Sequence, residues 1–312
     1  MEKENCKKLN ITAIQMSSII GDKFANFSKV QSLIENNINE STDIIVLPEV
    51  WTVGWKPSLF KESAEDINGE TIAFLSKIAK KYSVNIIGGS FISRRKDAKM
   101  QRCKEHHSQF TIHHSLFNSC PVINRNGELI ATYDKMHLFS YYGCDEGKFI
   151  KSGQNPVMIN FCLNSREIAS VGTSCLSQQP SPRNDDMVKI GLTICYDIRF
   201  PEIYRAYAKA GADLLVNMAA WPMSRAIHWE ALSKARAIEN QCFMVALTQS
   251  GLIENDEYNL GHSRIIDYEG NVVSEIKEGE GTMSAEIKFN EMYEFRKKCT
   301  VLLDIHDRYE LE

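Results

Sequence analysis

Three chemically capable side chains follow apolar stretches that are typical of buried strands. Glu49, Lys135 and Cys195 each stand at the end of such a stretch. In α/β proteins rich in parallel strands, catalytic groups collect at the carboxyl ends of strands. A carboxylate, an ammonium group and a thiol can supply the base, the oxyanion donor and the nucleophile of amide hydrolysis. These three residues therefore form a coherent set for nucleophilic hydrolysis.

The residues around Cys195 predict a sharp turn from a strand to a helix. The apolar run 190–195 would deliver the thiol to the turn, and Pro201 can open the next helix, because the first helical position needs no N–H. Backbone N–H groups and the positive end of a helix dipole at such a turn favour a thiolate and an oxyanion. The alternative is a buried strand cysteine without a chemical role.

The motifs P-E at 48–49, Y-D-K-M-H-L-F at 133–139 and C-Y-D-I-R-F-P-E at 195–202 resemble the nitrilase superfamily of carbon–nitrogen hydrolases in order and spacing. The resemblance extends from about residue 11 to about residue 287. Within the superfamily the chain is most similar to the omega-amidase group, through motifs at 211–215, 220–230 and 235–241. The resemblance implies an α-β-β-α sandwich of two mixed sheets, hydrolysis without any cofactor, and a homodimer.

The resemblance also assigns roles to the three residues. Glu49 would be the general base, and Lys135 would donate to the oxyanion together with the backbone N–H of Tyr196. A carboxylate is ordinarily a weak base, so we expect burial beside Leu47 and Trp51 to raise the pKa of Glu49.

A second glutamate often follows the lysine in this superfamily and holds it. Glu146 is the best match here, and Asp145 is the second candidate. The alternative for Glu146 is an acidic loop residue that faces solvent.

Three neighbouring polar residues are interpreted as structural. His137 is expected to be hydrogen-bonded rather than catalytic, and Asp197 is expected to brace the turn. Arg199 is expected in an ion pair, with Glu202 or a distant acid, and binding of substrate by Arg199 is the minority interpretation.

Substrate selection is expected at the rim of the pocket, where segment 219–225 should pass over the nucleophile. Trp221 would form a flat apolar wall, with Phe139 and Tyr196 as further wall residues. Arg225 either holds a substrate carboxylate through a bidentate contact or caps the following helix, and both interpretations stay open.

Alternating patterns predict layered α/β architecture with a mixed sheet. Ile227, Ala231 and Ile238 lie at helical spacing and are expected in the core. Strands are expected at 11–16, 43–47, 84–91, 110–124, 128–133, 190–195, 213–218, 243–248, 260–267, 271–276 and 282–287, and helices near 22–38, 70–82, 201–210 and 226–241.

We expect a single domain over 1–312 with a core at about 9–290. Segments 93–108 and 163–186 are expected to be surface insertions that form solvated loops, and 291–312 a C-terminal tail. The histidines and the cysteine in and near the first insertion match no closed zinc pattern, so no metal is expected at Cys103, His106, His107, His113 and His114.

Composition narrows the possible partners. The 312 residues carry a formal charge of −4 with interspersed signs, which gives no footprint for nucleic acid or an anionic membrane. The nine cysteines are scattered without a C-x-x-C pair, and no apolar stretch has the length of a membrane span. We therefore expect a cytoplasmic enzyme with reduced thiols that acts on a small-molecule amide.

The preferred function is an omega-amidase-like amidase that releases ammonia from a monoamide of a dicarboxylic acid through a thioester. The runner-up is an N-carbamoyl amine or amino-acid hydrolase, and nitrilase activity proper is disfavoured. A papain-like hydrolase would instead pair Cys195 with His228 or His262. A non-catalytic interaction module is the remaining class.

Overall fold

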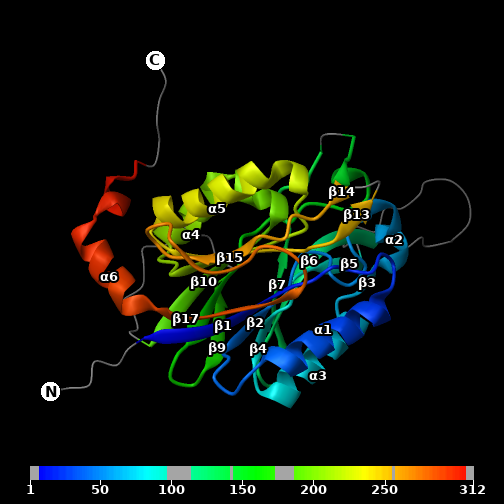
Figure 1. The fold of residues 1–312 in the computed structure, drawn as a ribbon, viewed down its shortest axis with the longest axis horizontal. Coiled ribbons are helices and arrows are strands. Elements are labelled where there is room, and N and C mark those ends of the chain that lie inside the picture. Colours follow the sequence, from blue (N-terminus) through cyan, green and yellow to red (C-terminus); the bar gives the residue numbers. More distant parts are fainter. Residues whose placement is uncertain (1–6, 97–113, 141–142, 173–185, 255–256, 307–312) are drawn as a thin grey trace, which may run out of the picture.

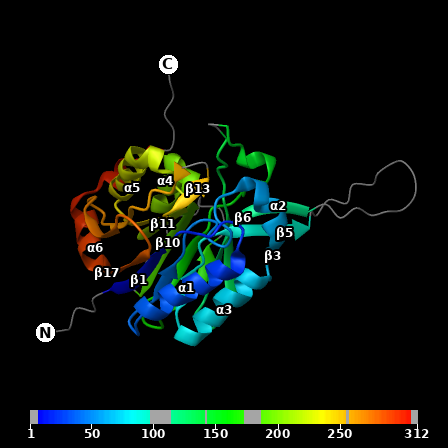
Figure 2. The ribbon, with the colours of Figure 1, turned by 45° about the vertical axis from the view of Figure 1, so that its right-hand side comes forward.

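Two mixed β-sheets lie face to face, and helices cover both outer sides (Figures 1 and 2). The computed structural model describes residues 7–96, 114–140, 143–172, 186–254 and 257–306. This arrangement confirms the predicted α-β-β-α sandwich of two mixed sheets.

The first sheet carries the N-terminal half of the chain. In spatial order its strands are β17 (Gly281–Lys288), β1 (Lys8–Gln15), β2 (Ile44–Val46), β4 (Asn85–Ile87), β6 (His114–Ile123), β5 (Phe91–Lys96) and β3 (Glu65–Asp66), with β7 (Leu129–Asp134) paired to β6. Parallel pairing joins β1 to β2 and β2 to β4, whereas β6 is antiparallel to β4, β5 and β7. Helices α1 (Lys23–Asn37) and α3 (Glu70–Tyr82) pack on the outer face of this sheet.

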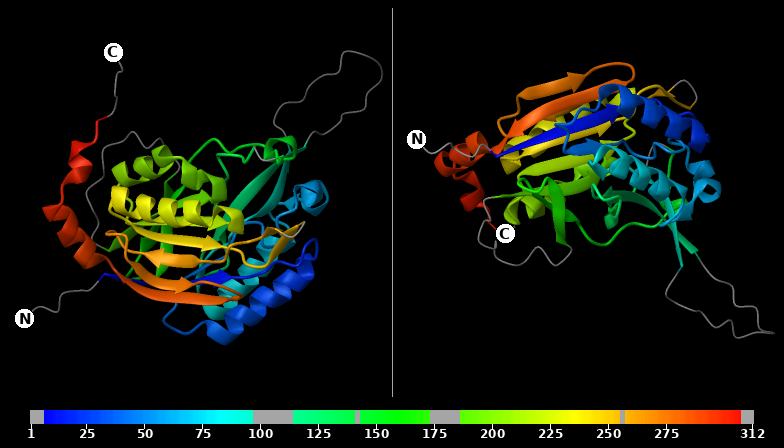
Figure 3. Two further views of the ribbon diagram at one scale, coloured as in Figure 1. Left: turned by 45° about the horizontal axis from the view of Figure 1, so that its top comes forward. Right: turned by 90° about the horizontal axis from the view of Figure 1, so that it is seen from below.

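The second sheet carries most of the C-terminal half. Its central strands β10, β11 and β12 are parallel, and antiparallel strands flank them on both sides. Helices α4 (Pro201–Lys209) and α5 (Ala226–Asn240) cover its outer face, as the left view of Figure 3 shows. Its strands are, in spatial order, β16 (Val272–Ile276), β15 (Ser263–Ile266), β12 (Phe243–Thr248), β11 (Leu214–Ala219), β10 (Met187–Ile194), β8 (Met158–Cys162) and β9 (Glu167–Gly172).

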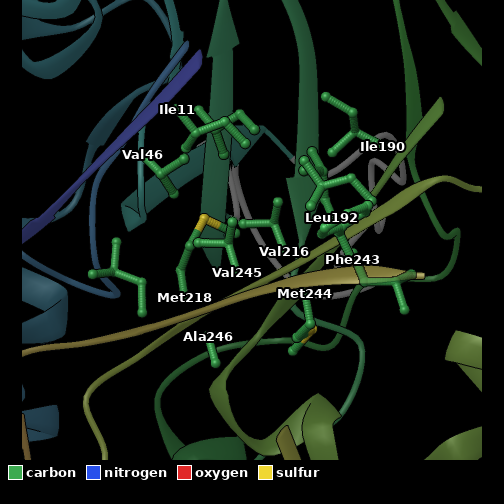
Figure 4. Packing of buried hydrophobic residues seen from close by; sticks show 14 of the residues in the cluster. Ile11, Val46, Ile190, Leu192, Val216, Met218, Phe243, Met244, Val245 and Ala246 are labelled. Carbon is green, nitrogen blue, oxygen red and sulfur yellow. The ribbon is translucent and has the colours of Figure 1, made fainter. Parts of the chain in front are cut away.

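The main core lies between the two sheets (Figure 4). Side chains alternate along a strand, so Ile44 and Val46 of β2 face this core while Ile45 packs beneath the helices. Across the interface, the Cys120 sulfur lies 3.7 Å from the Met218 sulfur. Burial on both faces explains why the strands appear in the sequence as nearly continuous apolar runs.

The expected strand 84–91 is in fact two strands, β4 and β5. The chain turns between them at Gly88 and Gly89, and Gly89 has a φ of +63°. A Cβ atom on Gly89 would lie 2.1 Å from the carbonyl oxygen of Pro48, so a larger residue does not fit. This turn packs against the backbone directly before Glu49.

The prediction of a surface insertion at 93–108 is wrong for its described part. Residues 93–96 complete β5, and the buried hydroxyl of Ser93 is 2.7 Å from that of Ser119 on β6. Pairing with β6 continues the sheet where the basic composition suggested a loop. Residues 97–108 lie outside the described residues.

The second predicted insertion, 163–186, also begins as regular structure. Strand β9 pairs antiparallel with β8 and extends the edge of the second sheet, so this part is not a solvated loop. Residues 173–185 lie outside the described residues.

The C-terminal tail, 291–312, contains regular structure in its described part. Helix α6 (Phe289–Lys298) and the 3-10 turn η5 (Val301–Asp304) occupy it as far as residue 306. Arg296 donates to the backbone oxygens of Gln241 and Ala212 and pairs with Asp213 at 3.2 Å. These contacts fasten α6 to the second sheet.

The core placement of Ile227, Ala231 and Ile238 is wrong. All three are exposed, with Ile227 79% and Ile238 49% accessible. The helix turns its other face inward and buries Trp229 and Ala237 instead. Helix α5 therefore presents an apolar stripe to the outside.

Candidate active site

Glu49, Lys135 and Cys195 follow β2, β7 and β10 respectively. The first two strands belong to one sheet and the third to the other. The expected convergence of strand ends therefore takes place across the interface between the sheets.

Lys135 lies between two carboxylates. Its Nζ donates to Oε1 of Glu49 at 2.9 Å and to Oε2 of Glu146 at 2.9 Å. All three side chains have no accessible surface. Burial opposes the charged amine, but the two carboxylates outweigh it and hold the pKa of Lys135 well above its ordinary value. Lys135 is therefore a permanent cation.

The surroundings of Glu49 are more polar than expected. Besides Lys135, the Nδ2 of Asn118 donates to Oε1 at 2.9 Å, and the backbone N–H of Ala220 donates to Oε2 at 2.8 Å. The backbone oxygen of Glu49 accepts from Gln249. Asn118 and Ala220 fix both carboxylate oxygens; Asn118 lies in none of the motifs, and Ala220 begins the motif at 220–230 but was given no role in the site.

Glu146, not Asp145, faces the lysine. Its carboxylate also accepts from the backbone N–H of Phe139 at 2.9 Å, and its own N–H donates to the Phe139 oxygen at 2.8 Å. Burial and the charge of Glu49 raise the pKa of Glu146 against the opposing effect of Lys135. Asp145 instead caps the short turn η2 (Glu146–Lys148) from outside.

Cys195 occupies a left-handed backbone position with a φ of +47°. It opens a 3-10 turn, η3 (Cys195–Arg199), and α4 begins only at Pro201. Burial and the charge of Glu49 hold the pKa of Cys195 well above its usual value, and the thiol donates to the backbone oxygen of Ala220 at 3.9 Å. One lysine does not offset burial and two carboxylates, so the thiol form is favoured and a general base has a proton to remove.

Asp197 ties the cysteine turn to the lysine segment. Its buried carboxylate accepts from the backbone N–H of Ile194 at 2.8 Å, the hydroxyl of Tyr133 at 2.6 Å and the backbone N–H of His137 at 2.9 Å. The Nδ1 of His137 lies 2.7 Å from the same carboxylate, and its ring stacks on Phe200 at 3.8 Å. Both residues thus have the structural contacts that were expected of them.

A cavity of about 300 Å³ opens at the thiol of Cys195. Phe139, Tyr196, Trp221 and Arg225, the predicted substrate-binding residues, all line it. Their aromatic rings form walls, and the rings of Phe139 and Tyr196 meet edge to face at 5.6 Å. Further lining residues that the motifs did not identify as pocket residues are Trp55, Cys144, Ser224, Ile253 and Glu257.

Arg199 also lines this cavity, which corrects its structural assignment. In the described part of the chain no carboxylate, including that of Glu202, lies within ion-pair distance of it. Its guanidinium lies 5.1 Å from the ring centre of Trp221, and Nη2 is 3.1 Å from Nδ1 of His228. The buried Nε of Arg199 has no hydrogen-bond partner.

No histidine among the described residues is hydrogen-bonded to Cys195. His228 contacts Arg199, and Nδ1 of His262 lies 3.4 Å from Glu230. The arrangement therefore does not favour a papain-like pair. Of the histidines and the cysteine considered for a metal, only His114, on β6, lies within the described residues.

Comparisons with known proteins give matches over nearly the whole chain. The family model described as carbon-nitrogen hydrolase matches residues 10–297. A 2-oxoglutaramate amidase of Bacillus subtilis is 32% identical, over 96% of this chain and 98% of that protein. A Staphylococcus aureus protein described as a hydrolase in the agr operon is 30% identical, over 95% and 98%.

Solved structures share the fold. A Saccharomyces cerevisiae member of branch 10 of the nitrilase superfamily superposes with a TM-score of 0.75, at 24% identity over 97% of both chains. Helices that could cross a bilayer, being both long and apolar enough, do not occur in the described ranges.

Proposed function

Because this chain belongs to the carbon-nitrogen hydrolase family, we propose that it is an omega-amidase-like enzyme that releases ammonia from a small dicarboxylic-acid monoamide. The observation that carries the proposal is the buried Glu49–Lys135–Glu146 cluster beside the thiol of Cys195 and its cavity. The amidase names of the relatives support the same reaction.

Glu49 begins the reaction by taking the thiol proton of Cys195. The sulfur attacks the amide carbon, and the carbonyl oxygen becomes an oxyanion. Lys135 donates to that oxyanion: an ammonium group has three hydrogens, and the two carboxylates require two of them. The backbone N–H of Tyr196 is the proposed second donor.

Glu49 then returns the proton to the nitrogen, ammonia leaves and a thioester remains. Water enters, gives a proton to Glu49 and attacks the thioester carbon. Collapse releases the acid, and the proton goes back to the sulfur. The sum is amide plus water giving acid plus ammonia, and no step requires a metal or a cofactor.

A substrate panel tests this function. Purified protein is expected to release ammonia from 2-oxoglutaramate and glutaramate, with a thioester adduct on Cys195 visible by intact mass. N-carbamoyl compounds serve as the comparison, because their hydrolysis also yields carbon dioxide. Carbon dioxide release without activity on the monoamides would favour the carbamoyl hydrolase. An unreactive Cys195 and no turnover would favour the interaction module.

We assign the substrate carboxylate to Arg199, with Arg225 as the competing residue. Arg199 lines the cavity, and no carboxylate of the described residues lies within ion-pair distance of it, whereas Nη1 of Arg225 already donates to the oxygen of Ser224 at 3.1 Å. A guanidinium without a carboxylate partner gains most from an incoming carboxylate.

Arg199→Gln is expected to lower kcat/KM for glutaramate about tenfold or more, since a charge-assisted contact is lost. Butyramide, which has no carboxylate, should change by less than about twofold. Arg225→Gln is the matched variant, and a larger selective loss there would transfer the assignment to Arg225. Equal losses on both amides would remove the carboxylate role of Arg199.

We also propose a cytoplasmic homodimer. The exposed apolar stripe of Ile227, Ala231 and Ile238 on α5 supports association, because covering it removes apolar surface from water. The free cysteines of the described residues are compatible with a reducing compartment. Sedimentation equilibrium on the full chain is expected to give twice the chain mass, and a monomer would contradict the dimer.

A further inference from the structure

The cavity beside Cys195 is lined by charged side chains of both signs. Arg199 and Arg225 are cationic, and Glu257 is anionic. The remaining walls are largely apolar and aromatic, so these charges are the groups that can orient a polar substrate.

Glu257 has no cationic partner within ion-pair distance among the described residues. Its carboxylate accepts a hydrogen bond from Ser224, whose hydroxyl donates to Oε1 at 2.9 Å. Arg199 likewise has no carboxylate within ion-pair distance in the part of the chain that the structure describes. The cavity therefore holds an anion and a cation that are not neutralised by each other.

The backbone keeps Glu257 at this position. Strand β14 (Glu257–Tyr258) pairs with β13 (Leu252–Glu254), and the N–H of Asn259 donates to the oxygen of Gly251 at 2.8 Å. The next N–H, of Leu260, donates to the oxygen of Trp221 at 2.7 Å. These bonds attach the β13–β14 hairpin to the segment that contains Trp221, which forms a wall of the cavity, and Ser224, whose hydroxyl donates to Glu257.

We propose that Glu257 is a specificity-determining residue that binds an ammonium group on the substrate beside the carboxylate held by Arg199. The preferred substrates are then the omega-amides of α-amino dicarboxylic acids. Such a molecule carries both an ammonium group and a carboxylate at the end away from the amide. This inference rests on the proposed amidase function and narrows its substrate. An ammonium group complements Glu257, whereas a second carboxylate there would be repelled.

The experiment compares three amides of the same chain length: L-glutamine, glutaramate and 2-oxoglutaramate. They carry, respectively, an ammonium group, no substituent and a keto group at the carbon next to the carboxylate. Ammonia release gives kcat/KM for the wild type, Glu257→Gln and Glu278→Gln. Glu278 is an exposed glutamate outside the cavity, so its variant makes the same change of charge elsewhere.

Glu257→Gln is expected to lower kcat/KM for L-glutamine about fivefold, the scale of a solvent-exposed ion pair. The values for the two amides without an ammonium group should stay within about twofold or rise, and Glu278→Gln should leave all three unchanged. The inference is overturned if Glu257→Gln affects the three amides equally. It is also overturned if the wild type cleaves glutaramate and 2-oxoglutaramate but not L-glutamine, a result that leaves the proposed function intact. Turnover of none of the three would instead remove the proposed function.

Discussion

Lys135→Met is expected to reduce ammonia release about a thousandfold. The variant loses the cation that donates to the oxyanion, and one such donor typically contributes a factor of that size. It also leaves Glu49 and Glu146 facing each other in a buried site without their shared partner. Removing one member of a buried ion pair costs about 3 to 5 kcal/mol, so the free energy of unfolding should fall as well.

A double variant separates chemistry from stability. Lys135→Met with Glu146→Gln has the same net charge in the site as the wild type, because one positive and one negative charge are removed together. Thermal unfolding should recover toward the wild-type temperature while activity stays lost. If Lys135→Met keeps more than about a tenth of the wild-type rate, the oxyanion role is wrong and a cysteine mechanism independent of lysine must be considered.

Glu49→Gln is expected to lower the rate of acylation by about 10² to 10⁴, the usual contribution of a general base. The thiol of Cys195 is protonated at rest because burial and nearby carboxylates raise its pKa, so attack requires removal of that proton. An amide at position 49 keeps an acceptor for Lys135 but has no basic oxygen. Intact-mass measurement after mixing with glutaramate should show no thioester.

Glu146→Gln is the matched control, since it makes the same change on the other side of Lys135. The base is kept, so the loss should be smaller than for Glu49→Gln. Because its pKa is raised, Glu146 takes up a proton at a higher pH than an ordinary glutamate as the pH falls. A glutamine at position 146 takes up no proton, so Glu146→Gln should remove the part of the fall in rate at acid pH that protonation of Glu146 causes. Unchanged acylation in Glu49→Gln would contradict the base assignment.

Helix and strand positions were largely predictable from local patterns. The expected helix 70–82 and the expected strand 243–248 coincide with α3 and β12. The helix has apolar residues at helical spacing, as expected for burial against one layer, and the strand is a continuous apolar run, as expected for burial on both faces. The break of 84–91 at Gly89 was missed, although the pair Gly88-Gly89 is a turn signal, because the apolar residues on both sides of the pair suggest one continuous strand.

Local periodicity failed for α5 for a different reason. Ile227 and Ile238 satisfy a helical pattern, but the helix buries Trp229 and the polar Ser233 and Asn240 instead. The hydroxyl of Ser233 donates to the oxygen of Glu230 at 3.3 Å and the Nδ2 of Asn240 donates to the oxygen of Arg236 at 3.0 Å, and such hydrogen bonds are not visible in a hydropathy pattern.

By itself the sequence determined the residue types that could do chemistry and the strand ends that carry them, because motif and spacing are local properties. Only the tertiary structure decided that Lys135 lies between Glu49 and Glu146, that Cys195 rests as a thiol, and that Arg199 faces a cavity rather than an ion-pair partner. Distances, burial and partners arise when two sheets pack against each other. They depend on residues such as Asn118 and Ala220, which are remote in the chain from the side chains they hold.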